Sequence, residues 1–165
     1  MFNVAIIPAR AGSNRLKNKN RRKINGISLI NWSINFAKKL NFLDHIVVTT
    51  DDKVILKELK KKNSSIKIIK RPKYLAKKRS RSEDVIIHAI NNYEKKFGKV
   101  DTILLLQPTS PIRSLKHVNA AFRKFNYFKK KKSIVSVFKS SSLSKRNFKI
   151  YNNNLILQND EKKTK

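Results

Sequence analysis

Hydrophobic residues along this chain recur with two different spacings. Short apolar runs rich in β-branched residues indicate strands, and apolar residues three or four positions apart indicate amphipathic helices. The predicted strands are Val4–Ile7, His45–Thr50, Ile66–Ile69, Thr102–Leu106 and Ser133–Val137. The predicted helices begin near Ser28, Asp52, Ser82 and Ser114, and a hairpin is predicted over Phe148–Leu157.

Capping residues support these helix boundaries. Ser82 and Ser114 are predicted N-caps, because a short side-chain oxygen can accept from the first free amides of a helix. Asp52 can open its helix in the same way. Gly98 is predicted to end the helix that starts at Ser82.

Strands that alternate with helices predict an α/β fold with a parallel sheet covered on both faces. Thr102–Leu106, TILLL, is apolar at successive positions, which predicts a central strand of that sheet. Loops that leave the carboxyl ends of parallel strands meet at one edge, where ligands bind. Three such loops are predicted: Pro8–Asn20, Arg71–Ser82 and Gln107–Arg113.

Length and composition predict one folded domain. The chain has 165 residues, 39% of them hydrophobic, and we expect residues 1–157 to form the domain and residues 158–165 a polar tail. No cysteine is present, which excludes disulfides and cysteine metal sites. The first residues do not resemble a signal peptide, and no apolar stretch is long enough to span a bilayer. We therefore expect a soluble, cytoplasmic protein without a membrane partner.

The formal net charge of +30 favours anionic partners: nucleic acid, anionic membrane surfaces or phosphorylated substrates. However, Lys greatly outnumbers Arg, and Asn and Ile are also abundant. All three residues have AT-rich codons, so an AT-rich genome is sufficient to produce much of the bias. The lysines are spread over nearly every predicted helix. We therefore expect any binding to nucleic acid to be non-specific.

The loop after Val4–Ile7 is basic and rich in turn residues. A Gly12–Ser13 turn lies among four cations, Arg10, Arg15, Lys17 and Lys19. Backbone amides and arginine forks bind phosphate oxygens, so this loop is suited to a polyphosphate. It matches neither of the two common phosphate-loop motifs, and on its own it also fits a solvated basic turn.

Three stretches together resemble a known family. IIPARAGSNRLKNKN (residues 6–20), NGISLINWSI (residues 25–34) and LLQPTSPIR (residues 105–113) resemble the acylneuraminate cytidylyltransferases. These enzymes activate sialic acids and related nonulosonic acids with CTP. The resemblance runs from about Asn3 to Val137 and implies a nucleotidyltransferase domain. The implied fold is a Rossmann-like three-layer sandwich like that of nucleotide-diphospho-sugar transferases.

The resemblance implies that the anomeric hydroxyl of a sugar acid attacks the α-phosphorus of CTP and releases pyrophosphate. Arg10 and Lys19 match positions that would neutralise phosphate oxygens. Ser13 and Asn20 match hydrogen-bond donors of the same triphosphate loop. These four residues are therefore the expected phosphate contacts, with Arg10 and Lys19 assigned the catalytic role.

The other two loops match the nucleoside and sugar sides of the family's site. Arg71 and Ser82 match positions near the cytosine and ribose, and Ser80 stands where a small residue is usual. Gln107 is expected to face the acceptor sugar. Arg113 is expected mainly to hold its loop in place, with a phosphate contact as the alternative.

Several residues depart from the family pattern. Asn14 and Lys17 stand where lysine and proline are usual. Tyr74 and Lys78 stand where acids are usual, and Lys78 reverses the sign of the charge. Asp51 matches a family turn, either as a site residue or as the acid that opens a helix. These departures put the nucleotide affinity and the geometry of the second loop in question.

A divalent cation is implied by the family, but its ligands are not identified in this chain. The resemblance places Mg²⁺ on aspartates in a later acidic segment, whereas after Asp101 the only acids here are Asp160 and Glu161. We therefore expect this chain alone to bind CTP but to turn over slowly, either as a fragment or as an inactive relative.

The alternative is that this chain is a catalytically weak relative that binds CTP or polyanions such as RNA. A homodimer is possible, and sialic, legionaminic and pseudaminic acids all fit as acceptor.

Other candidates for chemistry are weaker. The three histidines, His45, His88 and His117, lack metal-ligand spacing. The aromatic residues around Phe122 and Phe125 could stack on bases, but a buried helix face is the preferred interpretation.

Overall fold

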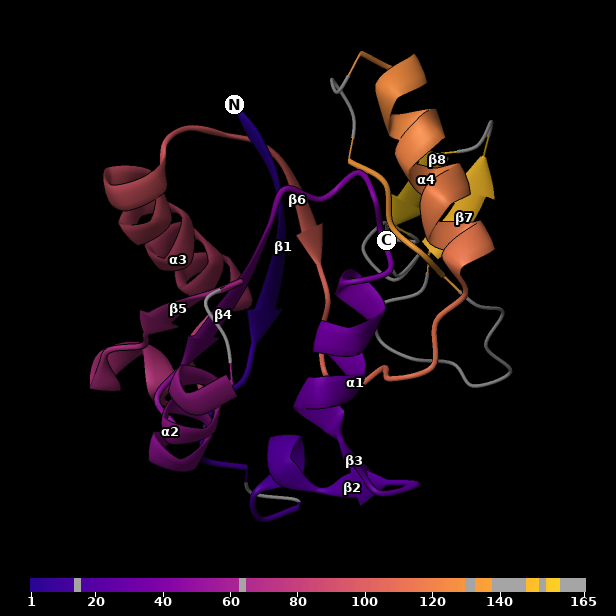
Figure 1. Cartoon of the computed structure of the whole chain (residues 1–165). Coiled ribbons are helices and arrows are strands. Elements are labelled where there is room, and N and C mark those ends of the chain that lie inside the picture. The colour runs from indigo at the N-terminus through magenta and orange to yellow at the C-terminus, as the bar shows by residue number, and fades with distance from the viewer. Residues whose placement is uncertain (14–15, 63–64, 130–132, 138–147, 152–153, 158–165) are drawn as a thin grey trace, which may run out of the picture. The chain divides into compact units, whose positions relative to one another are not determined.

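The computed structural model describes residues 1–13, 16–62, 65–129, 133–137, 148–151 and 154–157 (Figure 1). The chain divides into two compact units, Met1–Lys132 and Ser133–Lys165. The first unit contains β1 (Phe2–Pro8), η1 (Lys19–Arg21), β2 (Lys23–Ile24), β3 (Ile27–Ser28), α1 (Leu29–Ala37), β4 (His45–Thr50), α2 (Lys53–Lys62), β5 (Ile66–Lys70), η2 (Lys73–Ala76), α3 (Ser82–Phe97), β6 (Val100–Leu105) and α4 (Leu115–Tyr127). The second unit contains β7 (Phe148–Tyr151) and β8 (Asn154–Leu157), which pair as the predicted antiparallel hairpin. The predicted polar tail, residues 158–165, lies outside the described residues.

The main sheet has the strand order β5-β4-β1-β6, and all of its pairings are parallel. β1 lies between β4 and β6, with Ile6 opposite Val47 on one side and Leu105 on the other. The predicted α/β fold with a parallel sheet is confirmed. Since the four strands run in one direction, their carboxyl ends share one edge, from which the three predicted loops leave.

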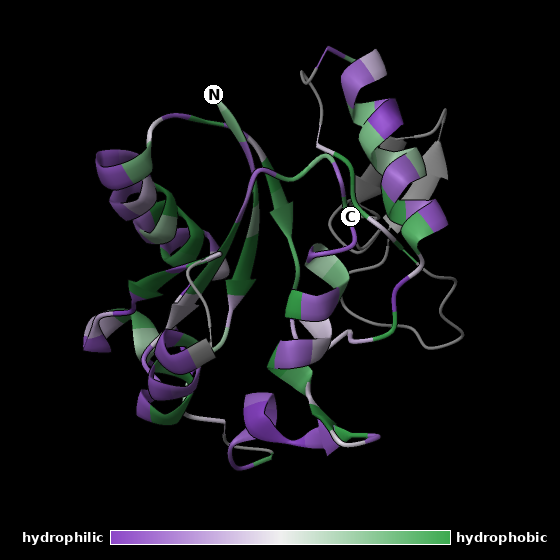
Figure 2. Cartoon of the chain, viewed as in Figure 1, coloured by the Kyte–Doolittle hydropathy of each residue, from purple (hydrophilic) through white to green (hydrophobic). Residues whose placement is uncertain are grey.

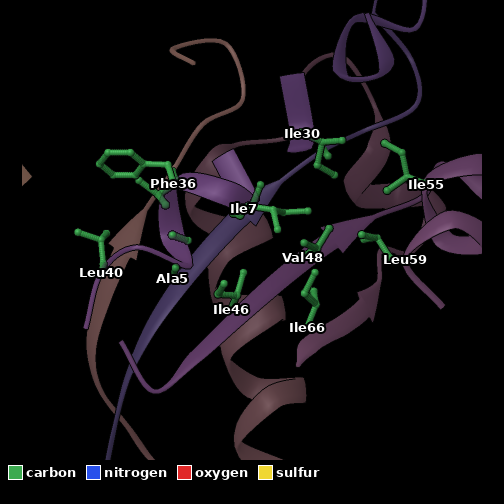
Figure 3. Close-up of a cluster of buried hydrophobic side chains, with 14 residues drawn as sticks. Ala5, Ile7, Ile30, Phe36, Leu40, Ile46, Val48, Ile55, Leu59 and Ile66 are labelled. Carbon is green, nitrogen blue, oxygen red and sulfur yellow. The ribbon is translucent and has the colours of Figure 1, made fainter. Parts of the chain in front are cut away.

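Helices cover both faces of this sheet (Figure 1). On one face, alternate strand residues such as Ala5, Ile7 and Val48 pack beneath α1 and α2 (Figure 3). On the other face, Val4, Ile6 and Val47 pack against Ala89 and Tyr93 of α3. Figure 2 shows the hydrophobic residues along the central strands and hydrophilic residues on the outer sides of α2 and α3. Because successive side chains of β1 point to opposite faces of the sheet, this one strand contributes to the hydrophobic cores on both faces.

The caps act largely as predicted. Asp52 accepts hydrogen bonds from the amides of Val54 and Ile55 at the start of α2. Ser114 accepts from the amide of His117 at the start of α4, and Gly98 ends α3. The prediction for α3 is wrong by one residue, because the helix already includes Ser82 and its N-cap is Arg81, which makes no capping side-chain bond.

Two strand predictions are wrong. The apolar pattern predicts Thr102–Leu106 at the centre of the sheet, but β6 is an edge strand of the described sheet. Its residues Ile103 and Leu105 are 41% and 37% exposed. Ser133–Val137 is predicted to be a strand, but these residues form none and are exposed. A β-branched run supplies strand propensity, but a strand forms only where a neighbouring strand offers a ladder.

The predicted buried face of α4 is only half-buried. No described side chain of this helix is fully buried. Its firmest contact is Phe122, which stacks on Phe42 with ring centroids 3.9 Å apart. No helix in the described part of the chain has the length and apolar character needed to span a bilayer.

Gly98 offers a test of this packing. Its φ of +104° and ψ of 175° lie in a region that essentially only glycine adopts, and a Cβ there would lie 3.2 Å from the Phe2 ring. We expect Gly98→Ala to lower the free energy of unfolding by about 1–3 kcal/mol in urea titrations. Gly26→Ala is the control, since Gly26 has φ +76° but a Cβ added there would meet nothing within 4 Å. A loss at Gly26 equal to that at Gly98 would contradict the prediction.

Candidate functional site

Three loops meet at the carboxyl edge of the sheet and line a cavity of about 250 Å³. They follow β1, β5 and β6. All eight residues predicted to contact substrate line this cavity: Arg10, Ser13, Lys19, Asn20, Arg71, Ser80, Ser82 and Gln107. The predicted convergence of the three loops is therefore confirmed, whereas the role of each residue stays a prediction.

A larger cavity of about 700 Å³ lies elsewhere, between α1, α2 and the β2–β3 hairpin. It contains none of the eight predicted residues. Its lining mixes apolar residues such as Ile34 and Leu59 with charged ones such as Glu58. The smaller cavity combines the convergent polar groups with the edge of a parallel sheet, which is the usual position of a ligand.

The end of β4 fixes the backbone of the loop after β1. The Ala9 amide donates to the Thr49 carbonyl over 3.0 Å, and the Thr50 hydroxyl donates to the Ala9 carbonyl. The Asp51 carboxylate accepts from the Ala11 amide at 2.9 Å. Asp51 is thus neither the helix cap nor a free acid, since it anchors the start of the basic loop.

The far end of the same loop is fastened at two further points. The Asn20 side-chain amide, which is 7% exposed, donates to the Arg10 carbonyl over 2.9 Å. Arg21 pairs with Asp52, with 3.1 Å between Nε and Oδ2. One N–H of the Asn20 side-chain amide is therefore engaged within the loop. The predicted contact of Asn20 with phosphate would use the second N–H of the same group.

Arg71 is a buried cation at the wall of the cavity, with an exposed fraction of only 5%. Its Nη2 donates to the Thr49 carbonyl over 2.9 Å, and its amide donates to the Thr50 carbonyl. Burial lowers the pKa of Arg71, nearby Asp51 raises it, and Arg10 lowers it again. An arginine nevertheless stays protonated at neutral pH. Its Nε is buried without a hydrogen-bond partner among the described residues.

The two serines of the second loop differ in their surroundings. The Ser80 hydroxyl donates to the Tyr74 carbonyl over 3.1 Å and so closes the turn that follows η2. Ser82 is the first residue of α3, and the amide end of that helix faces the cavity that Ser82 and Val85 line. Helix amide ends favour anions.

Arg113 holds the third loop. It donates to the Gln107 carbonyl, and its Nη1 donates to the buried Ser33 hydroxyl over 3.2 Å. Its guanidinium also lies 5.9 Å from the centroid of the Phe36 ring, and burial lowers the pKa of Arg113. Arg113 does not line the cavity. The predicted role in holding the loop is confirmed.

Sequence reasoning missed part of the cavity wall. Lys77 and Thr109 line it and were not predicted, and Lys78, noted only as a reversal of charge, lines it too. Their position in the two recognised loops was the available signal. With Arg10 and Lys19, these lysines make the wall strongly basic.

Carboxylates suited to a divalent cation are not gathered in the described part of the chain. No group of three or more His, Cys, Asp or Glu residues there could hold a metal ion. Asp51 and Asp52, which contact the basic loop, already bind the Ala11 amide and the α2 amides with Arg21. The described residues that line this cavity therefore offer no carboxylate to a divalent cation.

Comparison with known proteins supports the resemblance seen in the motifs. The cytidylyltransferase family matches residues 4–164. The chain belongs to this family. Family members are nucleotidyltransferases, and the parallel α/β sheet described here matches the fold of solved nucleotidyltransferase structures.

Three similar proteins illustrate the relationship. The N-acylneuraminate cytidylyltransferase of Escherichia coli O18:K1:H7 is 31% identical over 86% of this chain and 32% of that protein. The CMP-N,N'-diacetyllegionaminic acid synthase of Legionella pneumophila is 37% identical over 67% of this chain and 47% of that protein. The solved structure of CMP:2-keto-3-deoxy-manno-octonic acid synthetase complexed with CTP aligns with a TM-score of 0.62 and 21% identity, over 77% of this chain and 48% of that chain. The chain thus spans about half or less of the length of these relatives.

The contrast between Asp51 and Asp52 is testable by stability. Asp52→Ala removes the cap of α2 and the partner of Arg21, so we expect the free energy of unfolding to fall by about 2 kcal/mol. Asp51→Ala removes one hydrogen bond at a half-buried position, and we expect a loss of about 1 kcal/mol or less. Urea titrations followed by circular dichroism measure both. A larger loss for Asp51→Ala would mean that the roles of the two acids are reversed.

Proposed function

We propose that this chain is the nucleotide-binding part of a cytidylyltransferase that transfers CMP from CTP to the anomeric hydroxyl of a nonulosonic acid. The convergence of the eight predicted residues on one cavity, in a chain of the cytidylyltransferase family, supports the proposal most directly. Two relatives named for activating such acids match this chain at 31% and 37% identity.

The proposed step is a substitution at phosphorus. The anomeric oxygen forms a bond to the α-phosphorus of CTP and loses its proton to solvent, and the bond from that phosphorus to the bridging oxygen breaks. CMP-sugar forms and pyrophosphate leaves. Such transfers depend mainly on positioning and on stabilisation of the phosphate charge.

The first loop carries the phosphate contacts in this proposal. Arg10 and Lys19 neutralise phosphate oxygens, and Ser13 donates a hydrogen bond beside them. Asn20 acts chiefly by holding the Arg10 carbonyl, which keeps the loop in one conformation. A loop fastened before binding loses less entropy when the ligand arrives.

The other two loops carry the nucleoside and the acceptor. Arg71, Ser80 and Ser82 form the side of the cavity assigned to cytosine and ribose. Gln107 is assigned to the acceptor sugar, and Arg113 keeps the Gln107 backbone in place. Since the described lining of the cavity offers no carboxylate to a divalent cation, Arg10 and Lys19 carry the charge neutralisation in the proposed step.

Pyrophosphate release tests the proposal. The purified chain is incubated with CTP and, in turn, with sialic, legionaminic, pseudaminic and 3-deoxy-manno-octulosonic acids, with and without Mg²⁺. We expect CMP-sugar to form with at least one nonulosonic acid, because the eight residues that match the family's substrate contacts line one cavity. Product from 3-deoxy-manno-octulosonic acid alone would refute the assigned sugar class, and no product from any acid would refute the activity of this chain.

Base selectivity gives a prediction that is independent of turnover. We expect CTP to bind more tightly than ATP or GTP, by roughly tenfold, the equivalent of one hydrogen bond to the base. Calorimetric titration with each nucleotide measures the dissociation constants. Equal affinities would reduce the cavity to a non-selective phosphate site.

Lys19 gives a prediction for the phosphate loop. Lys19→Ala should weaken CTP binding by about 1.5–3 kcal/mol, since it removes a charged donor from the cavity wall. The control is Lys95→Ala, which removes the same charge from an exposed position in the last turn of α3. The loop assignment is wrong if both substitutions weaken CTP binding equally.

A further inference from the structure

The wall of the 250 Å³ cavity carries charge of one sign only. Five cationic residues line it, and none of the described residues that line it is an acid. The five come from two of the three loops: Arg10, Lys19, Arg71, Lys77 and Lys78. A concentration of like charge in a partly enclosed space raises the local potential well above that of an evenly charged surface.

One of these cations is poorly satisfied without a ligand. Arg71 is only 5% exposed, and its Nε has no hydrogen-bond partner among the described residues. A buried charged donor without an acceptor is costly, and the charge of an anion in the adjacent cavity would offset part of that cost. The buried Arg71 guanidinium and a lining with only positive charges thus occur at the same cavity.

We infer that this cavity binds its nucleotide as the metal-free polyphosphate, with Lys77 and Lys78 as additional phosphate-binding residues. The inference rests on the proposed function only in taking the ligand to be a nucleoside triphosphate. It goes beyond that function by assigning the ionic form of the ligand and by giving these two lysines a role in binding it.

The reason is a competition between two kinds of countercharge. Mg²⁺ is usually held by one or two protein carboxylates together with the phosphates of the substrate. Here none of the described residues that line the cavity is a carboxylate. Of the two nearby acids, Asp51 accepts from the Ala11 amide through Oδ1, and Asp52 is engaged by Arg21 and the α2 amides. A bound Mg²⁺ cancels part of the triphosphate charge and is itself repelled by the cationic wall. The metal complex therefore interacts less favourably with this wall than the free anion does.

Calorimetry with the purified chain tests the inference. CTP is titrated once with EDTA and once with saturating MgCl₂, and NaCl keeps the ionic strength equal, because surface electrostatics depend on salt. We expect metal-free CTP to bind at least about tenfold more tightly, the equivalent of one charged contact. Equal or tighter binding in MgCl₂ would overturn the inference. CMP is the ligand control and should show a much smaller effect of Mg²⁺.

The two lysines are tested by a charge-matched pair of variants. The double substitution Lys77→Gln with Lys78→Gln should weaken metal-free CTP at least about tenfold and reduce the difference between the EDTA and MgCl₂ titrations. The control, Lys95→Gln with Lys96→Gln, removes the same charge from the other end of α3 and should change neither. All four lysines are exposed, so both variants should fold, which thermal melts verify. Equal effects of the two variants would overturn the assignment of Lys77 and Lys78.

Parallel titrations with ATP and GTP separate this inference from the proposed function. A preference for metal-free nucleotide without selectivity for CTP would support the inference and refute the cytosine assignment. Selectivity for CTP that is strongest with Mg²⁺ would support the cytosine assignment and refute the inference that the nucleotide binds free of metal.

Discussion

The parallel pairing of β1 with β4 determines where the loop that builds the cavity begins. Pro8 pairs opposite Thr49 and has no amide to continue the ladder. The Ala9 amide makes the last bond to Thr49, and from there the side chains of Thr50 and Asp51 hold the departing backbone. Where the β1–β4 ladder ends, hydrogen bonds from the side chains of Thr50 and Asp51 therefore take over from backbone ladder bonds. These side-chain bonds fix the conformation of the basic loop.

The parts of this arrangement that were predictable are those encoded locally. The run Val4–Ile7 is a strand because it is apolar and β-branched, and Asp52 opens a helix because its side chain can reach the next free amides. The meeting of the three loops followed from a rule about parallel sheets, since every strand of such a sheet delivers its carboxyl end to the same edge. No contact between distant residues had to be known for either inference.

The parts that were not predictable depend on residues far apart in the sequence. The bond from the Ala11 amide to Asp51 joins residues 40 positions apart, and no local pattern encodes their meeting. The bond from Asn20 to the Arg10 carbonyl lies within one loop, but the conformation that it closes is set by those distant contacts. The edge position of β6 is of the same kind. The same apolar sequence pattern occurs in central and in edge strands, and the position of a strand depends on which other strands pair with it.

Arg71 shows why the charge of this cavity cannot be separated from its architecture. The side chain that faces the cavity also donates to the Thr49 carbonyl, at the strand end that fixes the first loop. A neutral residue at this position would remove the repulsion from Arg10 but would also remove one of the two donors to the Thr49 carbonyl, leaving the Ala9 amide. The formal charge of +30 describes the whole chain. The burial of Arg71 has a local origin, because a charge is kept out of water only where specific partners hold it. The basic character of the cavity is therefore a property of the fold at this edge, which the overall charge of the chain does not by itself explain.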